Sequence, residues 1–266
     1  QEESDKGDII YPKHLRLGHL RQQLNPQEVD QSLLEYVLSG ATEIQRIQEE
    51  IHLAEQALEK SEGSQDELLE KIGKLEEDFQ HWGGYDIKYR SETALSGLGF
   101  KEEDFARGFS EFSGGWQMRA ELARTLIANP DILLLDEPSN FLDVPAVEWL
   151  QRFIKDYEGT LLLISHDRFL LRSLTNITLE IAGGKSIRYP GDYNYYLSER
   201  EGRYAQQLAA WKNNVQKREE LERFIERFKA KATKARQAQS RVKLLEKMEV
   251  IDEPVALKNR SLIRIA

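Results

Sequence analysis

Two short apolar segments constrain the fold of this chain most strongly. Residues Ile132–Leu135 and Thr160–Ile164 are rich in large aliphatic side chains, and each run is bounded by charged or turn-forming residues. Runs this short and this apolar are typical of strands buried in a parallel sheet. A helical pattern over about residues 145–157 lies between them, so the segment is predicted to form a strand–helix–strand unit.

Composition excludes several classes of protein. The 266 residues carry a net charge of −9, which excludes a uniformly basic nucleic-acid binder but not a locally basic one. The chain has no cysteine, so disulfides, thiolate zinc sites and cysteine nucleophiles are excluded. The longest apolar runs have four residues and no signal peptide is visible. We therefore expect a soluble, cytoplasmic protein with one large or two ordinary domains.

Residues 43–79 have the pattern of two amphipathic helices joined by a short turn. Their apolar residues recur at intervals of three and four, first from Ile44 to Leu58 and then from Leu68 to Phe79. This spacing predicts an antiparallel helical hairpin with a narrow apolar seam. Residues 43–78 carry a net charge of −8, so RNA phosphate does not suit this surface, and it faces a basic protein or water.

A second helical stretch, residues 198–249, concentrates the positive charge of the chain. Residues 223–243 hold eight Lys or Arg and one Glu, whereas the other 245 residues together carry −16. One interpretation is a solvated helix face, and the other is contact with nucleic-acid phosphates at a helix break near Ala230–Thr233. The candidate nucleic-acid-binding residues are Arg223, Arg227, Lys229, Lys231, Lys234, Arg236, Arg241 and Lys243.

The segment Ser113-Gly114-Gly115 is a candidate phosphate contact. It precedes a helical pattern that runs through Ile127. Glycines at a helix N-terminus leave backbone N–H groups open to a phosphate. The alternative is structural, because serine is also an ordinary helix N-cap.

Polar residues follow both apolar runs. Asp136 and Glu137 come directly after the first, where one carboxylate can hold Mg²⁺ and the other can polarise a water. His166 follows the second run and can contact a terminal phosphate. Solvated carboxylates and a capping or core histidine are the structural alternatives.

Together these elements, in this order and spacing, resemble an ATP-binding cassette (ABC) nucleotide-binding domain. The resemblance implies ATP and Mg²⁺ as cofactors, Glu137 and His166 as catalytic residues, and Asp136 with Gln22 as metal contacts. Gln23 is a one-residue alternative to Gln22. The cofactor-binding positions that it implies are Gln22, Ser113, Gly114, Gly115 and Asp143.

The run Leu135-Asp-Glu-Pro-Ser-Asn-Phe-Leu-Asp143 is similar to that of ABC-F proteins, and the hairpin and basic stretch resemble the YheS-like branch. The sequence departs from the family at Ser139, in place of Thr, and at Phe141, in place of His. The resemblance implies an ATPase without a membrane domain that acts on the ribosome. Its linker would contact rRNA and peptidyl-site tRNA, and its cassette would pair with a second ABC domain of the same chain.

The motif G-x4-G-K-[ST], which would cradle the ATP phosphates, does not occur in the chain. We expect it to precede Gln1 in a longer protein, with a second cassette after Ala266, and we expect the 266-residue piece alone to be inactive. The expected fold is α/β, an ABC-type domain with an inserted helical hairpin followed by an all-α linker. The expected segments are a cassette over residues 1–197 with a hairpin insertion at about 41–90, a linker over 198–253, and the start of a second cassette over 254–266.

Two other functions stay open from the residues. The chain can be the ATP-binding subunit of a membrane transporter, which would need no basic linker. It can also be a structural or DNA-associated ABC-type ATPase, in which longer and less basic helical insertions are expected.

Overall fold

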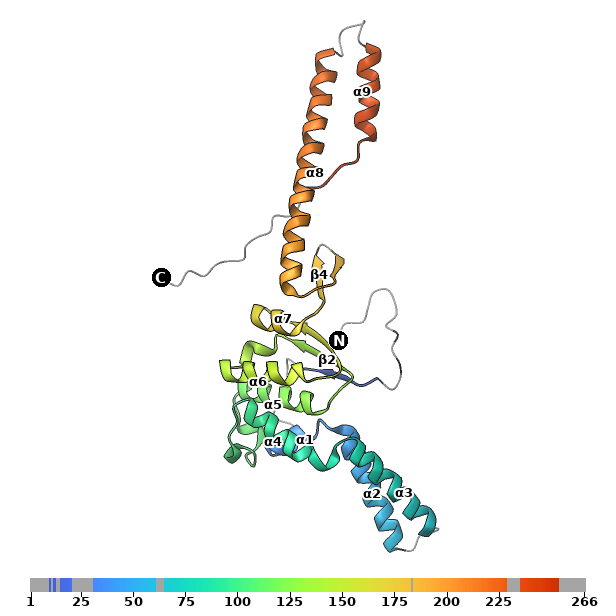
Figure 1. The fold of residues 1–266 in the computed structure, drawn as a ribbon, viewed down its shortest axis with the longest axis vertical. Helices are drawn as coiled ribbons and strands as arrows, with labels where there is room; N and C mark the ends of the chain where they lie inside the picture. Colours follow the sequence, from blue (N-terminus) through green and yellow to red (C-terminus); the bar gives the residue numbers. More distant parts are fainter. Residues whose placement is uncertain are drawn as a thin grey trace, which may run out of the picture. The chain divides into compact units, whose positions relative to one another are not determined.

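The computed structural model describes residues 10, 12, 15–20, 31–60, 65–182, 184–228 and 235–253. The chain divides into two compact units, residues 1–175 and residues 176–266. Figure 1 follows their elements in chain order. None of the helices within these described ranges combines the length and the apolar character that crossing a membrane requires.

The first unit contains a parallel sheet of three strands in the order β1–β2–β3. The strands are β1 (Leu17–His19), β2 (Ile132–Asp136) and β3 (Thr160–Ile164). The register pairs Leu17 with Ile132 and Asp136 with Ile164, so β2 and β3 end at the same edge. The predicted strand–helix–strand unit is thus confirmed, with helix α6 (Val144–Lys155) between β2 and β3.

The expectation that both strands are buried is correct for β2 and wrong for β3. Leu133 and Leu135 of β2 are fully buried in the core, whereas Leu162 and Ile164 of β3 are 53% and 57% exposed. The difference arises because β3 pairs only with β2 among the described strands, and one of its faces lies open. The apolar composition of a run therefore predicts a strand, but it does not show which neighbours cover that strand.

Helices pack around this sheet to form the core of the first unit. Leu122 and Leu126 on α5 are buried in one cluster with Leu150 on α6 and with the β2 leucines. The further helices of this unit are α1 (Leu33–Leu38), α4 (Ile87–Gly97), α5 (Gly114–Ile127) and α7 (Arg168–Leu174). Short 3-10 turns are η2 (Gly84–Asp86), η3 (Glu102–Asp104), η4 (Phe109–Glu111) and η5 (Pro138–Phe141).

The predicted helical hairpin is present as α2 (Thr42–Glu59) and α3 (Gln65–His81). The two helices lie side by side in Figure 1 and pack against one another. Ile44, Ile47 and Leu75, all in the predicted seam, are buried. Periodicity alone therefore located both helices, while residues 61–64 between them lie outside the described part of the chain.

The second unit starts with the antiparallel hairpin β4 (Thr178–Ala182) and β5 (Lys185–Tyr189). Two helices follow, α8 (Tyr193–Phe228) and α9 (Ala235–Lys247). The predicted break near Ala230–Thr233 falls outside the described residues, between the end of α8 and the start of α9.

Polar contacts hold the elements of the second unit together. The hydroxyl groups of Tyr189 and Tyr196 donate to the Glu180 carboxylate, which also pairs with Arg200 at 2.9 Å. Burial raises the pKa of Tyr196 from 10.0 to about 12, so this hydroxyl remains a protonated donor even at pH values at which a free tyrosine ionises. These bonds join the β4–β5 hairpin to the first turns of α8.

Candidate functional site

The predicted carboxylate pair lies at the carboxyl end of β2. Asp136 is the last residue of the strand, opposite Ile164 of β3, and Glu137 follows in a left-handed conformation with φ 49° and ψ 50°. The N–H of Glu137 donates to the Ile164 carbonyl at 2.8 Å. A left-handed conformation costs a residue with a Cβ about 1–2 kcal/mol. The chain therefore holds Glu137 in a strained turn that directs it out of the strand, and such strain is concentrated at functional sites.

The structure brings the two predicted catalytic residues together. The backbone N–H of His166, just beyond β3, donates to Glu137 Oε2 at 3.1 Å, and His166 Nε2 lies 3.6 Å from Glu137 Oε1. The Glu137 side chain is 18% exposed, whereas that of His166 is 88% exposed. The carboxylate is thus anchored at the edge of the sheet, while the imidazole stays open to a ligand from solvent.

The Ser-Gly-Gly segment forms the N-terminus of α5. Ser113 is the N-cap residue, but its side chain makes no capping hydrogen bond. A Cβ on Gly114 would meet nothing within 4 Å, and one on Gly115 would approach only Phe141, at 3.9 Å. Packing among the described residues therefore does not require either glycine. Their absent side chains instead leave the first N–H groups of the helix open to a group from outside, which suits a phosphate.

Asp143 is the N-cap of α6, where its Oδ1 accepts a hydrogen bond from the Ala146 N–H at 3.1 Å. Its other oxygen, Oδ2, lies 3.5 Å from Arg119 on α5. Helix α5, which begins at the predicted phosphate contact Ser113–Gly115, and Asp143 are thus neighbours. No hydrogen bond or ion pair among the described residues links Ser113–Gly115 to Glu137 or His166, so the site consists of two separate clusters in this chain.

Two features of this region were not predicted from the sequence. Arg119 lies in the helix that follows Ser113, but the sequence suggests no role for it, and its partners are 21 to 24 residues away in the chain. A pocket of about 410 Å³ also opens beside Ser113, lined by Asp104, Arg107, Glu111, Phe112, Ser113 and Trp116. There the Lys101 backbone N–H and the Arg107 guanidinium hold the pKa of Asp104 below its ordinary value. The contacts of Arg119 depend on tertiary packing and so do not follow from a local pattern, whereas the pocket is lined entirely by the segment 104–116.

The basic residues of the second unit are only partly described. Lys229, Lys231 and Lys234 lie outside the described residues, and for Arg236 only the backbone, in α9, is described. The predicted metal contact Gln22, in the first unit, also lies outside the described residues. Arg223 and Arg227 on α8 and Arg241 and Lys243 on α9 are exposed. The guanidinium carbon of Arg241 on α9 also lies 3.8 Å from the centre of the Phe224 ring on α8, so the two helices are in contact there.

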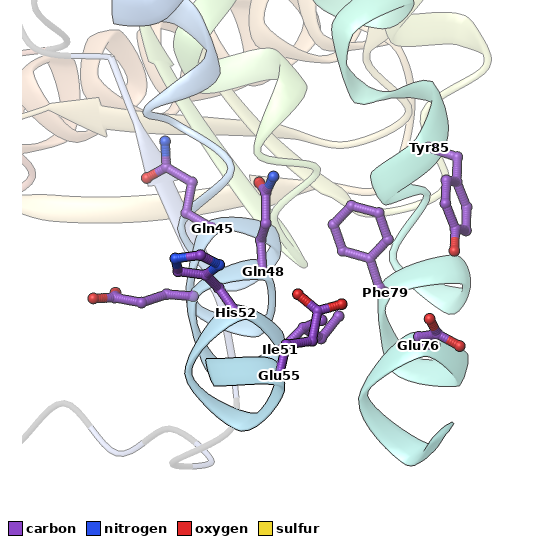
Figure 2. A pocket seen from close by; sticks show the side chains of 9 residues that line it. Gln45, Gln48, Ile51, His52, Glu55, Glu76, Phe79 and Tyr85 are labelled. Atoms are coloured by element: carbon purple, nitrogen blue, oxygen red, sulfur yellow. The ribbon is translucent and has the colours of Figure 1, made fainter. Parts of the chain in front are cut away.

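A larger pocket, of about 570 Å³, lies between the helices of the hairpin and contains no predicted site residue. Figure 2 shows side chains of α2 and α3 facing one another across it, with Phe79 and Tyr85 together. Its lining residues are Gln45, Gln48, Glu49, Ile51, His52, Glu55, Glu76, Phe79 and Tyr85. The hairpin pocket is therefore separate from the two clusters described above.

Comparison with known proteins identifies the family. Residues 21–140 and 179–263 match two family models, each described as ABC transporter. The chain is 40% identical over 245 residues to the "Probable ATP-binding protein YheS" of Haemophilus influenzae, which covers 92% of this chain and 37% of that protein. It is 35% identical over 242 residues to ATP-binding cassette sub-family F member 3 of Pongo abelii, covering 89% of this chain and 33% of that protein.

Among solved structures, a similar chain occurs in the complex of an archaeal ribosomal stalk protein with an archaeal ribosome recycling factor. That chain has a TM-score of 0.47 and 22% identity, over 74% of this chain and 32% of its own length. The present chain spans about 37% of the length of the YheS relatives from Haemophilus influenzae and Escherichia coli K12. By its sequence relatives, this chain belongs to the ABC-F type of ATP-binding cassette proteins.

Proposed function

We propose that this chain is part of an ATPase that acts on the ribosome, with ATP-driven closure of two cassettes and a basic linker that contacts tRNA and rRNA. The observation that carries the ATPase proposal is the Glu137 carboxylate, held at the end of β2 by the His166 N–H. A carboxylate in that position orients a water for attack and accepts its proton. The exposed imidazole of His166 then contacts the terminal phosphate.

The residues present fit Mg²⁺ with ATP. Mg²⁺ is held in such sites by one or two carboxylates together with substrate phosphates and water. Asp136 would supply one hard oxygen ligand beside Glu137, and no cluster of three acidic or histidine side chains gathers among the described residues. This donor set suits a metal that arrives with a nucleotide, with Gln22 as the second proposed contact.

The segment Ser113–Gly115, which resembles the signature segment of ABC domains, would bind a nucleotide held by another cassette. Ser113 and Gly114 are exposed, and no described contact connects them with Glu137. Their N–H groups would stabilise the phosphate charge of an ATP bound opposite, with Asp143 beside them. Each cassette of the closed pair would thus complete the other's site.

The charge of the second unit supports the proposed ribosomal partners, which the family resemblance implies. Exposed lysine and arginine side chains on α8 and α9 suit RNA phosphates, whose neutralisation releases counterions. We place this activity in the cytoplasm, where ribosomes are. Cosedimentation of a protein of the relatives' length with ribosomes tests the proposal directly. We expect it to pellet with ribosomes, and a protein that stays in the supernatant would contradict this function.

The description of the matched family models favours a second candidate, the ATP-binding subunit of a membrane transporter. The same sedimentation experiment separates the candidates when membrane vesicles replace ribosomes. Binding to vesicles but not to ribosomes would support the transporter, whereas the reverse result supports the ribosomal function.

The 266-residue chain by itself should neither hydrolyse ATP nor bind it tightly. It contains no G-x4-G-K-[ST] loop, so the amides and the lysine that would anchor the phosphates are not available from its own sequence. Gly184-Lys185-Ser186 cannot replace them, because it lies at the turn of the β4–β5 hairpin rather than at the start of a helix. Titration calorimetry with Mg-ATP should give no measurable heat, and micromolar affinity would reveal a nucleotide site elsewhere in the chain.

A further inference from the structure

Arg119 connects three segments that are distant in sequence. From helix α5, its Nε donates to the Phe141 carbonyl at 2.7 Å, and its Nη1 donates to the Leu98 carbonyl at 3.0 Å. The same Nη1 lies 3.5 Å from Asp143 Oδ2, and the side chain is only 12% exposed. This guanidinium therefore joins α5 to the end of α4 and to the turn that precedes α6.

The surroundings are shaped for a guanidinium. The Arg119 guanidinium lies 4.5 Å from the centre of the Trp116 ring, one helical turn closer to Ser113. Gly99 has φ +97°, and a Cβ there would come within 2.9 Å of Arg119 Nη1. A left-handed glycine thus leaves the room that the side chain occupies.

The contacts require arginine rather than a positive charge alone. A planar guanidinium presents several donors in a rigid fork and stacks on an aromatic face at the same time. A lysine ammonium is a compact charge on a flexible stem, so it cannot reproduce the two carbonyl bonds and the stacking together. The bond to the Leu98 carbonyl is partly buried, so leaving that carbonyl without a partner would also be costly.

The turn that Arg119 holds is continuous with the catalytic carboxylate. The Asn140 N–H donates to the Glu137 carbonyl at 3.2 Å, and the Leu142 N–H donates to the Ser139 carbonyl at 3.1 Å. Residues 137–142 thus form one hydrogen-bonded turn, and Arg119 donates a hydrogen bond to it at the Phe141 carbonyl. A displacement of α5 would reach Glu137 through this turn.

We propose that Arg119 is a positioning residue that sets the signature segment Ser113–Gly115 in fixed geometry relative to the turn of residues 137–142, which starts at Glu137 and leads into Asp143. When a nucleotide from another cassette binds the signature, α5 and this turn then move together, so that the position of Glu137 responds to the opposite site. The catalytic part of this inference rests on the proposed ATPase function, whereas the mechanical coupling can be tested separately.

The first test measures amide hydrogen exchange in this chain. In Arg119→Lys we expect the Asn140 and Leu142 amides to exchange about tenfold faster, since the turn loses its anchor, while amides in the middle of α6 stay protected. Arg152→Lys is the matched control, because Arg152 bonds to the Glu148 carbonyl of its own helix. Unchanged exchange at Asn140 and Leu142 would overturn the coupling. Should Arg119→Ala fail to fold, the lysine variant still decides.

The second test measures steady-state ATP hydrolysis by a protein of the relatives' length. We expect Arg119→Lys to lower kcat by about tenfold or more, because small displacements of catalytic groups are costly, while KM for ATP changes less than about twofold. An unaltered kcat in a hydrolysing protein would overturn the catalytic role. If the unsubstituted protein hydrolyses no ATP, the proposed function fails, and the exchange measurement still decides the coupling.

Discussion

Replacement of Glu137 by glutamine is expected to slow ATP hydrolysis by about 10²–10⁴-fold, the usual contribution of a positioned acid–base group. The amide keeps the size of the side chain and can still occupy the turn after β2, but it cannot accept a proton from water. ATP binding should persist, because Asp136 and the proposed phosphate contacts are unchanged. The measurement is phosphate release by a protein of the relatives' length, with the equivalent change in its other cassette.

Glu158→Gln is the matched control for this prediction. Glu158 is an exposed carboxylate of the same unit without a described hydrogen bond or ion pair, so its replacement should leave the rate unchanged. If the Glu137 double variant hydrolyses ATP at the rate of the unsubstituted protein, Glu137 is not the catalytic carboxylate. In that case the anchoring by His166 is purely structural.

Reversal of charge in the basic stretch should have the second large effect. Replacement of Lys229, Lys231, Lys234 and Arg236 by Glu should weaken binding to ribosomes or tRNA and flatten its dependence on salt. The slope of log K against log [salt] is negative, and each lost phosphate contact reduces its magnitude by about one unit, so the loss of four contacts reduces it by about four. Affinities measured over a range of salt concentrations give this slope directly, and ATP binding should not change.

A control with the same change in net charge distinguishes local contact from overall repulsion. Lys60, Lys71, Lys74 and Lys88 belong to the acidic hairpin and the following helix, so their replacement by Glu alters net charge without touching the basic stretch. This control should keep the original slope. An unchanged slope in the basic-stretch variant would instead indicate a solvated helix face.

Local patterns were sufficient to predict most elements of this fold. The strands at Ile132 and Thr160 follow from apolar runs bounded by charged and turn-forming residues, and the helical hairpin follows from a seam of period 3.6. The family resemblance implied Glu137 and His166 as catalytic residues but predicted no contact between them. The physical reason for their contact is the parallel register of β2 and β3, which places the ends of both strands at one edge of the sheet.

Contacts that depend on tertiary packing were not predictable. The role of Arg119 depends on the Leu98 and Phe141 carbonyls, which no spacing rule connects with it. The open face of β3 also escaped prediction, because its leucines and isoleucine have the composition of a buried strand. The family resemblance implied the motif residues, whereas the contact of Arg119 on α5 with the turn after Glu137 was visible only in the structure.

The most direct test of this account is the nucleotide dependence of ribosome binding by the Glu137→Gln protein of the relatives' length, with the equivalent change in its other cassette. If Glu137 drives hydrolysis that releases the protein from ribosomes, this variant should cosediment with ribosomes in ATP and stay in the supernatant in ADP. A variant that binds ATP but sediments equally in both nucleotides would contradict the account.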